Sequence, residues 1–236
     1  MCNNALQMYK NVVVDFTPVA TSMDWIFNGV FNKENEELNF FTSEQVENKI
    51  ADVLSRIPKR ILDVAFELGW KIIATNNRNL EAECGALGEI YGYTNFRDKE
   101  FVIYPTLKGI NESLPHELAH LLDVLLNVSS SKEWLKVFNE EKEQYEKMRY
   151  TFTAPDQKEE CFADAFMLYI FDEKRLEKLA PKTYKVIKNI FQHVDYLLNN
   201  KCIEEYVKEE EQRSKTLLNE LTDSSIFTTS YNSFDI

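Results

Sequence analysis

Residues 114–123 read LPHELAHLLD and contain two of the three histidines in the chain. His116 and His120 lie four residues apart, so on an α-helix both imidazoles project from one face, one turn apart. This spacing suits two nitrogen ligands of a tetrahedral zinc ion. Glu117 lies between them in sequence, where its carboxylate can take a proton from an attacking water and later deliver it to a leaving amine. The H-E-x-x-H pattern therefore predicts a zinc centre with Glu117 as the general base.

The alternative is an ordinary amphipathic helix that carries two exposed histidines. Under either interpretation an apolar stripe would dock the helix on a core. The stripe consists of Leu118, Leu121, Leu122 and Leu125. Three scattered histidines would give H-E-x-x-H by chance in only roughly a few chains per thousand, which favours the zinc hypothesis. Because Pro115 is tolerated within a first turn, the helix is predicted to begin near Ser113.

A catalytic zinc needs a third protein ligand and an open fourth position. The residues LLDVLL follow His120, so no third histidine stands at the spacing of the longer motif H-E-x-x-H-x-x-G-x-x-H. The remaining histidine, His193, falls on a later amphipathic segment and is interpreted as a partly exposed helix residue. The third ligand is therefore predicted to be a carboxylate.

The stretch EECFADAF, residues 159–166, supplies carboxylates on a predicted helix. Glu160 and Asp164 lie one turn apart, so the first could bind the metal while the second accepts the spare N–H of a zinc histidine and fixes its tautomer. Glu159 is the competing ligand, and periodicity alone does not separate the two glutamates. The plainer interpretation is that these acids complement the dipole at the start of a helix.

Two helices and three short strands are predicted ahead of the histidine motif. Thr42-Ser-Glu-Gln45 is a capping-box pattern that opens a helix over 43–57, and Pro58 starts a second helix that stops at Gly69. Apolar runs bounded by turn residues predict the strands. These strands cover 71–75, 88–94 and 100–105.

From about residue 112 onward the chain is predicted to be almost entirely helical. Ser130-x-x-Glu133 is expected to cap one helix, and two further helices are expected over 157–171 and 181–198. A small sheet with helices before it and a helical half after it is typical of an α+β protein.

The composition narrows the class of protein. The chain has 236 residues, of which 44% are hydrophobic and 28% charged, as in soluble globular proteins. Its net charge of −12 opposes binding to nucleic acid or to anionic lipid and suits a polypeptide partner. No stretch is long and apolar enough to span a bilayer, and the N-terminus shows no standard leader. The four cysteines form no C-x-x-C pair and are expected to be free thiols.

Three stretches, HELAHLLD, ECFADAFMLY and APKTYKVIKNIF, together resemble the catalytic domain of anthrax lethal factor and the related clostridial Pro-Pro endopeptidases. The resemblance extends over about residues 45–198. It implies that His116, His120 and Glu160 are the zinc ligands, that Glu117 is the catalytic base and that Asp164 is the second acidic position. It thereby favours Glu160 over Glu159.

Two positions depart from the pattern of this family. Ala119 stands where the family usually has glycine, a change that a helix tolerates. Thr153 stands where the family has a tyrosine that donates a hydrogen bond to the oxyanion. Tyr150, three residues earlier, is the nearest substitute, because this role needs a donor for charge that develops in the transition state. The alternative is that Tyr150 only packs as an aromatic side chain.

The resemblance implies a zincin-like fold, with a small twisted sheet over an active-site helix and a mainly helical C-terminal half. Residues 42–200 are the predicted catalytic domain. Residues 1–41 are expected to be irregular, with no assigned role, and residues 201–236 to form a charged, solvated helix and a mobile tail. Peptide substrates of such enzymes add as a strand to the sheet edge. The candidate edge is 88–94, with a buried hairpin strand as the alternative.

These observations predict a zinc metalloendopeptidase with one Zn²⁺ that acts on a protein or peptide substrate as a monomer. One alternative is a catalytically weak or inactive binding module of the same fold, of the kind found in toxin components. Another is a helical structural protein without a metal. The sequence does not determine which bond is cut. Localisation is also open, because the relatives act outside the producing cell whereas the sequence by itself favours the cytoplasm.

Overall fold

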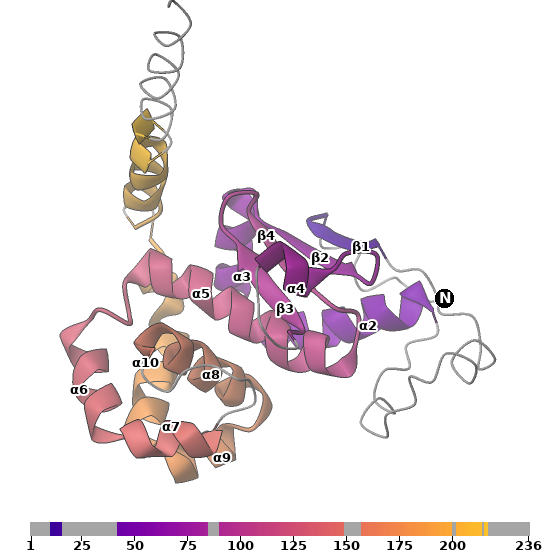
Figure 1. Cartoon of the computed structure of the whole chain (residues 1–236). Coiled ribbons are helices and arrows are strands. Elements are labelled where there is room, and N and C mark those ends of the chain that lie inside the picture. Colours follow the sequence, from indigo (N-terminus) through magenta and orange to yellow (C-terminus); the bar gives the residue numbers. More distant parts are fainter. Residues whose placement is uncertain are drawn as a thin grey trace, which may run out of the picture.

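The computed structural model of the chain describes residues 10–15, 42–84, 90–148, 157–199, 202–213 and 215–216. These residues form one four-stranded sheet with helices on both sides (Figure 1). The strand order is β1-β2-β4-β3, in which β1, β2 and β4 run parallel and β3 runs antiparallel to β4. The strands are β1 (Val12–Asp15), β2 (Lys71–Thr75), β3 (Gly92–Asn95) and β4 (Glu100–Ile103). The predicted α+β class is confirmed.

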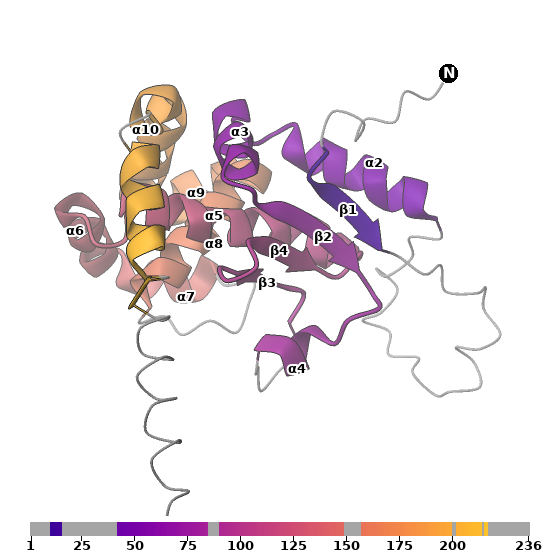
Figure 2. The same ribbon diagram turned by 90° about the horizontal axis from the view of Figure 1, so that it is seen from above.

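The helices fall into a group beside the sheet and a larger group below it. Beside the sheet lie α2 (Ser43–Leu54), α3 (Lys59–Glu67) and the short α4 (Leu80–Cys84). The π-helical turn η3 (Gly109–Ser113) leads into α5 (Leu114–Leu126). Below are α6 (Lys132–Glu140), α7 (Lys142–Met148), α8 (Lys158–Phe171), α9 (Glu173–Leu179) and α10 (Pro181–Leu197). A further helical stretch covers 202–213. Helix α5 runs between the sheet and the lower helices (Figures 1 and 2).

Local signals explain how the first elements begin and end. The Thr42 hydroxyl accepts a hydrogen bond from the backbone N–H of Gln45, and the Gln45 side chain accepts one from the Thr42 N–H, so the predicted capping box is present. Gly69 follows α3 with a φ of +87°, a conformation in which glycine avoids the strain of a side chain. The sharp stop after α3 turns the chain directly into β2.

The core lies on both sides of α5. Leu118 and Leu122 are fully buried on α5, and Phe162 and Phe166 are fully buried on α8. Helix α8 is buried around most of its circumference because the other lower helices surround it, which explains its nearly continuous apolar sequence. Helices α5 and α8 make the most extensive contact between any two elements of the described chain. This packing brings the histidine-bearing helix α5 and the acidic start of α8 together, although they are distant in sequence.

The start of α5 differs from a plain helix N-terminus. Helix α5 begins at Leu114, as predicted, but the π-helical turn η3 precedes it directly. A Cβ on Gly109 in this turn would collide with the carbonyl oxygen of Tyr104, so only glycine fits there. The close approach fixes the entry of the chain into α5.

Three details of the sequence prediction need correction. The N-cap of α6 is Ser131, whose hydroxyl accepts from the Trp134 N–H, and not Ser130. Strand β1 lies within residues 1–41, which were expected to be irregular. Its four residues pair with β2 in parallel register. The helix over 202–213 is not simply solvated, since Tyr206 is only 6% exposed and packs into the main core.

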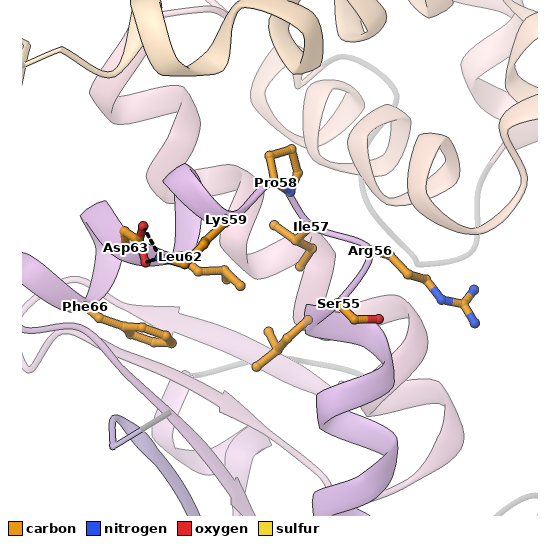
Figure 3. Close-up of a pocket in the computed structure, with 9 residues that line it drawn as sticks. Ser55, Arg56, Ile57, Pro58, Lys59, Leu62, Asp63 and Phe66 are labelled. Carbon is orange, nitrogen blue, oxygen red and sulfur yellow. Dashed lines mark hydrogen bonds and ion pairs between the residues drawn. The ribbon is translucent and has the colours of Figure 1, made fainter. Parts of the chain in front are cut away.

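None of the described helices is long and apolar enough to cross a membrane. A surface pocket of about 520 Å³ lies where α2 meets α3 (Figure 3). Its walls are apolar residues such as Leu62 and Phe66 together with the Lys59–Asp63 ion pair, which has an N–O distance of 2.6 Å. This pocket contains no histidine or cysteine and none of the predicted site residues.

Candidate metal centre

Helix α5 places two imidazoles beside each other. The ring centroids of His116 and His120 are 4.9 Å apart, and the rings are nearly perpendicular, at 81°. His116 is buried, with 6% of the residue exposed, and the His120 side chain is 18% exposed. The spacing of four residues therefore has the expected effect, and both rings face the same region of the molecule.

Helix α8 brings one carboxylate to both rings. Glu160 Oε2 lies 3.1 Å from His116 Nε2, and Glu160 Oε1 lies 3.6 Å from His120 Nε2. Ligand atoms of all three residues lie within 4.8 Å of one another. Two nitrogens and a carboxylate oxygen thus lie close together, an arrangement that could hold a metal ion.

Asp164, one turn further along α8, supports the first imidazole. Its Oδ1 lies 3.0 Å from His116 Nδ1, and the residue is 5% exposed. A carboxylate at this distance favours a proton on Nδ1, so Nε2, which faces Glu160, is the nitrogen that a metal ion would bind in place of a proton. Asp164 lies where the sequence pattern predicted a carboxylate partner for a ligating histidine.

The charges in this cluster favour a cation. Burial lowers the pKa of His116, but hydrogen bonds to Asp164 and Glu160 outweigh it and raise the pKa to about 10. Burial raises the pKa of Glu160, and the hydrogen bond from His116 outweighs it, so this pKa lies below its ordinary value. Among the described residues, no lysine or arginine forms an ion pair with Glu160. The same negative field that holds a proton on His116 attracts a divalent cation.

The residues present fit a metal ion on chemical grounds. Imidazole nitrogen with carboxylate oxygen is a donor set for zinc and similar transition metals, and three protein ligands leave a coordination position open for substrate or water. The partner carboxylate on His116 is the usual outer support of such a set.

Glu117 lies on the flank of this cluster and has a partner that the sequence did not reveal. The residue is 7% exposed. The hydroxyl of Thr94, on strand β3, lies 2.7 Å from Glu117 Oε2 and 3.1 Å from the Glu117 carbonyl oxygen. A threonine at the predicted sheet edge was a visible feature, but nothing in the sequence indicates which helix residue a strand side chain will meet.

The remaining residues considered in the sequence analysis lie away from the cluster or outside the described residues, except Ala119, which lies within α5. The Glu159 side chain is 48% exposed and lies 3.7 Å from Lys158, so the structure brings Glu160 and not Glu159 to the histidines. His193 is exposed, and its Nδ1 lies 2.9 Å from the carbonyl oxygen of Asn189 on its own helix. Tyr150, the candidate oxyanion donor, lies outside the described residues, as does Thr153. Ala119 is fully buried within α5.

Strand β3, which lies in the predicted substrate-binding edge, is an edge strand among the described strands. Strand β3 lies at the end of the strand order and pairs with β4 alone among the described strands. It also contacts α5, which carries the histidines. Of the predicted span 88–94, residues 88–89 lie outside the described part of the chain, and the strand itself covers Gly92–Asn95.

Comparison with known proteins shows which family part of the chain resembles. Residues 105–190, which contain every predicted site residue, match the family model described as anthrax toxin lethal factor, N- and C-terminal domain. The predicted resemblance to the lethal factor family is confirmed. No curated protein matches the sequence of this lethal factor-like chain.

Among solved structures, the Pro-Pro endopeptidase from Paenibacillus alvei is similar to this lethal factor-like chain, with a TM-score of 0.53. The match covers 79% of this chain and 100% of the endopeptidase, at 21% sequence identity. At this identity the likeness concerns the fold. The predicted zincin-like arrangement, a small sheet over the histidine-bearing helix with a helical half below, is confirmed.

Proposed function

We propose that this lethal factor-like chain is a zinc-dependent metalloendopeptidase. The observation that carries the proposal is the convergence of His116, His120 and Glu160, with Glu117 beside them on the same helix. In a tetrahedral zinc site, bonds near 2.0 Å separate neighbouring ligand atoms by about 3.3 Å. The two observed histidine–glutamate separations, 3.1 Å to Oε2 and 3.6 Å to Oε1 of Glu160, are close to this value.

When bound, zinc supplies a Lewis acid that polarises the scissile carbonyl and lowers the pKa of a water ligand. The other tasks fall to residues of the chain. Glu117 accepts the proton of the attacking water and passes it to the leaving amine, so that a neutral product departs. Asp164 keeps the His116 ring in one tautomer and orientation through the contact at Nδ1.

The substrate proposed for this site is an extended peptide. Strand β3 has one partner among the described strands, so its other side can pair with the main chain of a peptide. Such pairing would place the peptide beside Thr94 and above α5, next to Glu117. Tyr150 remains our candidate for the donor that stabilises the oxyanion.

The decisive experiment compares the full-length protein with its Glu117→Gln variant. Both are incubated with a peptide library that includes Pro-Pro bonds, the kind of bond after which the structural relative is named, and cleavage is read by mass spectrometry. We expect the wild type to cleave and the variant to be slower by about a hundred- to ten-thousandfold, as for loss of a general base. The zinc content of both proteins, measured by elemental analysis, should be equal because Glu117 is not a ligand.

Equal cleavage by the two proteins would refute the role of Glu117. Zinc binding without any cleavage would instead support a binding module of the same fold. Absence of bound zinc after purification, together with no change in melting temperature on chelation, would refute the metal centre itself.

A further inference from the structure

The side chain of Thr94, on strand β3, contacts Glu117 on the active-site helix α5. The hydroxyl lies 2.7 Å from Glu117 Oε2, a normal distance for a hydrogen bond from a hydroxyl to a carboxylate. A threonine hydroxyl has a single proton, and the carboxylate accepts it at closer range than the Glu117 carbonyl oxygen, which is 3.1 Å away. No hydrogen bond to Oε1 of Glu117 is found in the described parts of the chain, so this second oxygen is available to a water molecule.

The main chain of Thr94 has a separate role at the sheet edge. In the antiparallel hairpin, Thr94 lies opposite Phe101 and Gly92 opposite Ile103. The N–H of Tyr104 donates to the carbonyl oxygen of Tyr91 at 2.8 Å, which identifies that pair as hydrogen-bonded across the hairpin. Because hydrogen-bonded and non-hydrogen-bonded pairs alternate, Gly92 and Thr94 direct their N–H and C=O groups away from β4, toward the open edge.

Close packing fixes the distance between this strand and the helix. A Cβ on Gly92 would lie 3.0 Å from the Cβ of Ser113, the residue just before α5, and 2.9 Å from Cγ2 of Ile103. The strand therefore lies against the start of the helix with no spare room. The separation of Thr94 from Glu117 follows from this packing and does not depend on two flexible side chains finding each other.

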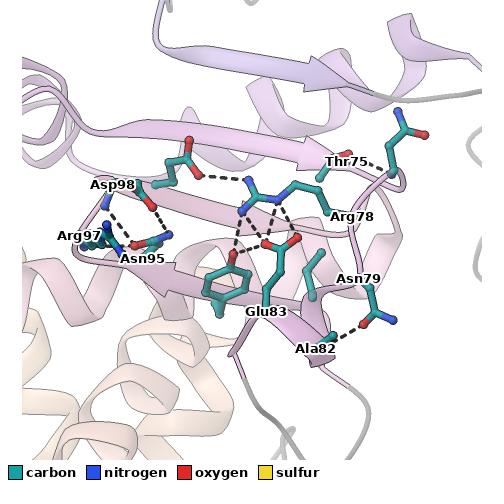
Figure 4. A network of polar contacts seen from close by, with 12 residues as sticks. Thr75, Arg78, Asn79, Ala82, Glu83, Asn95, Arg97 and Asp98 are labelled. Carbon is teal, nitrogen blue, oxygen red and sulfur yellow. Dashed lines mark hydrogen bonds and ion pairs between the residues drawn. The ribbon is translucent and has the colours of Figure 1, made fainter. Parts of the chain in front are cut away.

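The opposite face of the strand is anchored as well. Tyr93 points away from α5, and its hydroxyl accepts from Arg78 at 2.9 Å and donates to Glu83 at 2.6 Å. Arg78 also reaches Glu100 on β4, with an N–O distance of 3.1 Å, which ties the edge strand to its neighbour (Figure 4). Thr94 is thus held by contacts on both faces of β3.

We infer that Thr94 is a positioning residue that couples the peptide-binding edge to the general base. Its N–H and C=O pair with the substrate main chain, while its hydroxyl holds Oε2 of Glu117 and leaves Oε1 for the attacking water. The inference deepens the proposed peptidase function and rests on it.

The test uses the full chain loaded with zinc and a quenched fluorescent peptide chosen from the bonds that the wild type cleaves. Thr94→Val removes the hydroxyl but keeps the branched shape that suits a strand, and Thr94→Ser keeps the hydroxyl. Thr75→Val is the matched control, because Thr75 is a fully buried threonine on β2 whose hydroxyl contacts Asp15 at 3.3 Å. For each protein kcat, KM, zinc content and melting temperature are measured.

We expect Thr94→Val to lower kcat by about 10- to 100-fold, the loss typical of one hydrogen bond to a charged group, while KM changes less than about threefold. Zinc content should stay at the wild-type level. Thr94→Ser should restore kcat to within about threefold of the wild type, and Thr75→Val should leave kcat unchanged.

Several results would overturn the inference. A wild-type kcat in Thr94→Val would show that the hydroxyl does not position the base. Equal losses in the valine and serine variants, or loss of zinc or folding in the valine variant, would show a purely structural role. Failure of the wild type to cleave any peptide, by contrast, would refute the proposed peptidase and is recognised before the Thr94 variants are compared.

Discussion

Two clusters of charged side chains lie against the same edge strand, one on each face. On the face of Tyr93, the guanidinium of Arg78 contacts the carboxylates of Glu83 and Glu100, so the cluster contains its own permanent cation. On the face of Thr94, two imidazoles and several carboxylates converge. There, within the described segments, the Glu160 carboxylate forms ion pairs with His116 and His120 and with no lysine or arginine.

The difference indicates which cluster is structural and which can recruit a cation. A guanidinium between two carboxylates pairs with both and offsets one of their two negative charges, and the pKa of Arg78 is raised chiefly by its hydrogen bond to Glu83. In the other cluster the positive charge is a proton on an imidazole, which a metal ion can replace at the ring nitrogens that face Glu160. The pKa of His116, about 10 despite the opposing effect of burial, reflects how strongly the carboxylates favour a positive charge there.

The comparison can be tested most directly at the proposed metal ligands. Glu160→Gln replaces a charged ligand by a neutral amide, and we expect zinc affinity to fall by more than about a hundredfold and peptide cleavage to be lost. The matched control is Glu159→Gln, the neighbouring exposed carboxylate, which should bind zinc as the wild type does. Competition titration with a chromophoric chelator measures both affinities. Equal losses in the two variants would mean that the charge of α8, and not ligation by Glu160, governs binding.

A smaller effect is expected from the support of the first imidazole. Asp164→Asn removes the carboxylate that contacts His116 Nδ1 at 3.0 Å but retains a side chain of the same size. We expect zinc affinity to fall by about 10- to 100-fold, with the fold retained as judged by circular dichroism. An unchanged affinity would show that the orientation of the ring is fixed by packing alone.

The smallest effect is expected on the other face of β3. Glu83→Gln should lower the free energy of unfolding by about 0.5 to 1 kcal/mol at neutral pH, the range of a partly exposed ion pair, and leave zinc affinity unchanged. Hydrogen bonds from Arg78 and Tyr93 place the pKa of Glu83 below its ordinary value of 4.5.

The stabilisation by Glu83 is therefore fully present above pH 4.5 and is lost as pH falls through the lower folded value. Urea unfolding of the wild type and the variant should show a stability difference that narrows in acid. Glu177→Gln, at an exposed residue of α9, is the control and should show no such difference. A change in zinc affinity in Glu83→Gln would contradict the separation of the two clusters.

Many of the helix and strand boundaries could be predicted from local sequence. The capping box at Thr42, the stop at Gly69 and the span of β2 depend on residues next to one another, and they lie where predicted. Strand β1 was missed because four residues, VVVD, carry too weak a signal without their partner strand. The N-cap of α6 was misplaced by one residue, since Ser130 and Ser131 are equivalent candidates until the backbone selects one.

The sequence by itself determined that His116, Glu117 and His120 share one region of a helix, because the helical repeat is a local property of the backbone. It left Glu159 and Glu160 open on periodicity, and only family resemblance favoured the second. Tertiary structure decided what depends on contacts between elements. The packing of α5 on α8 brings Glu160 to both imidazoles, and the register of β3 over α5 gives Glu117 its partner Thr94. Such contacts join residues 23 and 44 positions apart, and no local pattern encodes distances across that much chain.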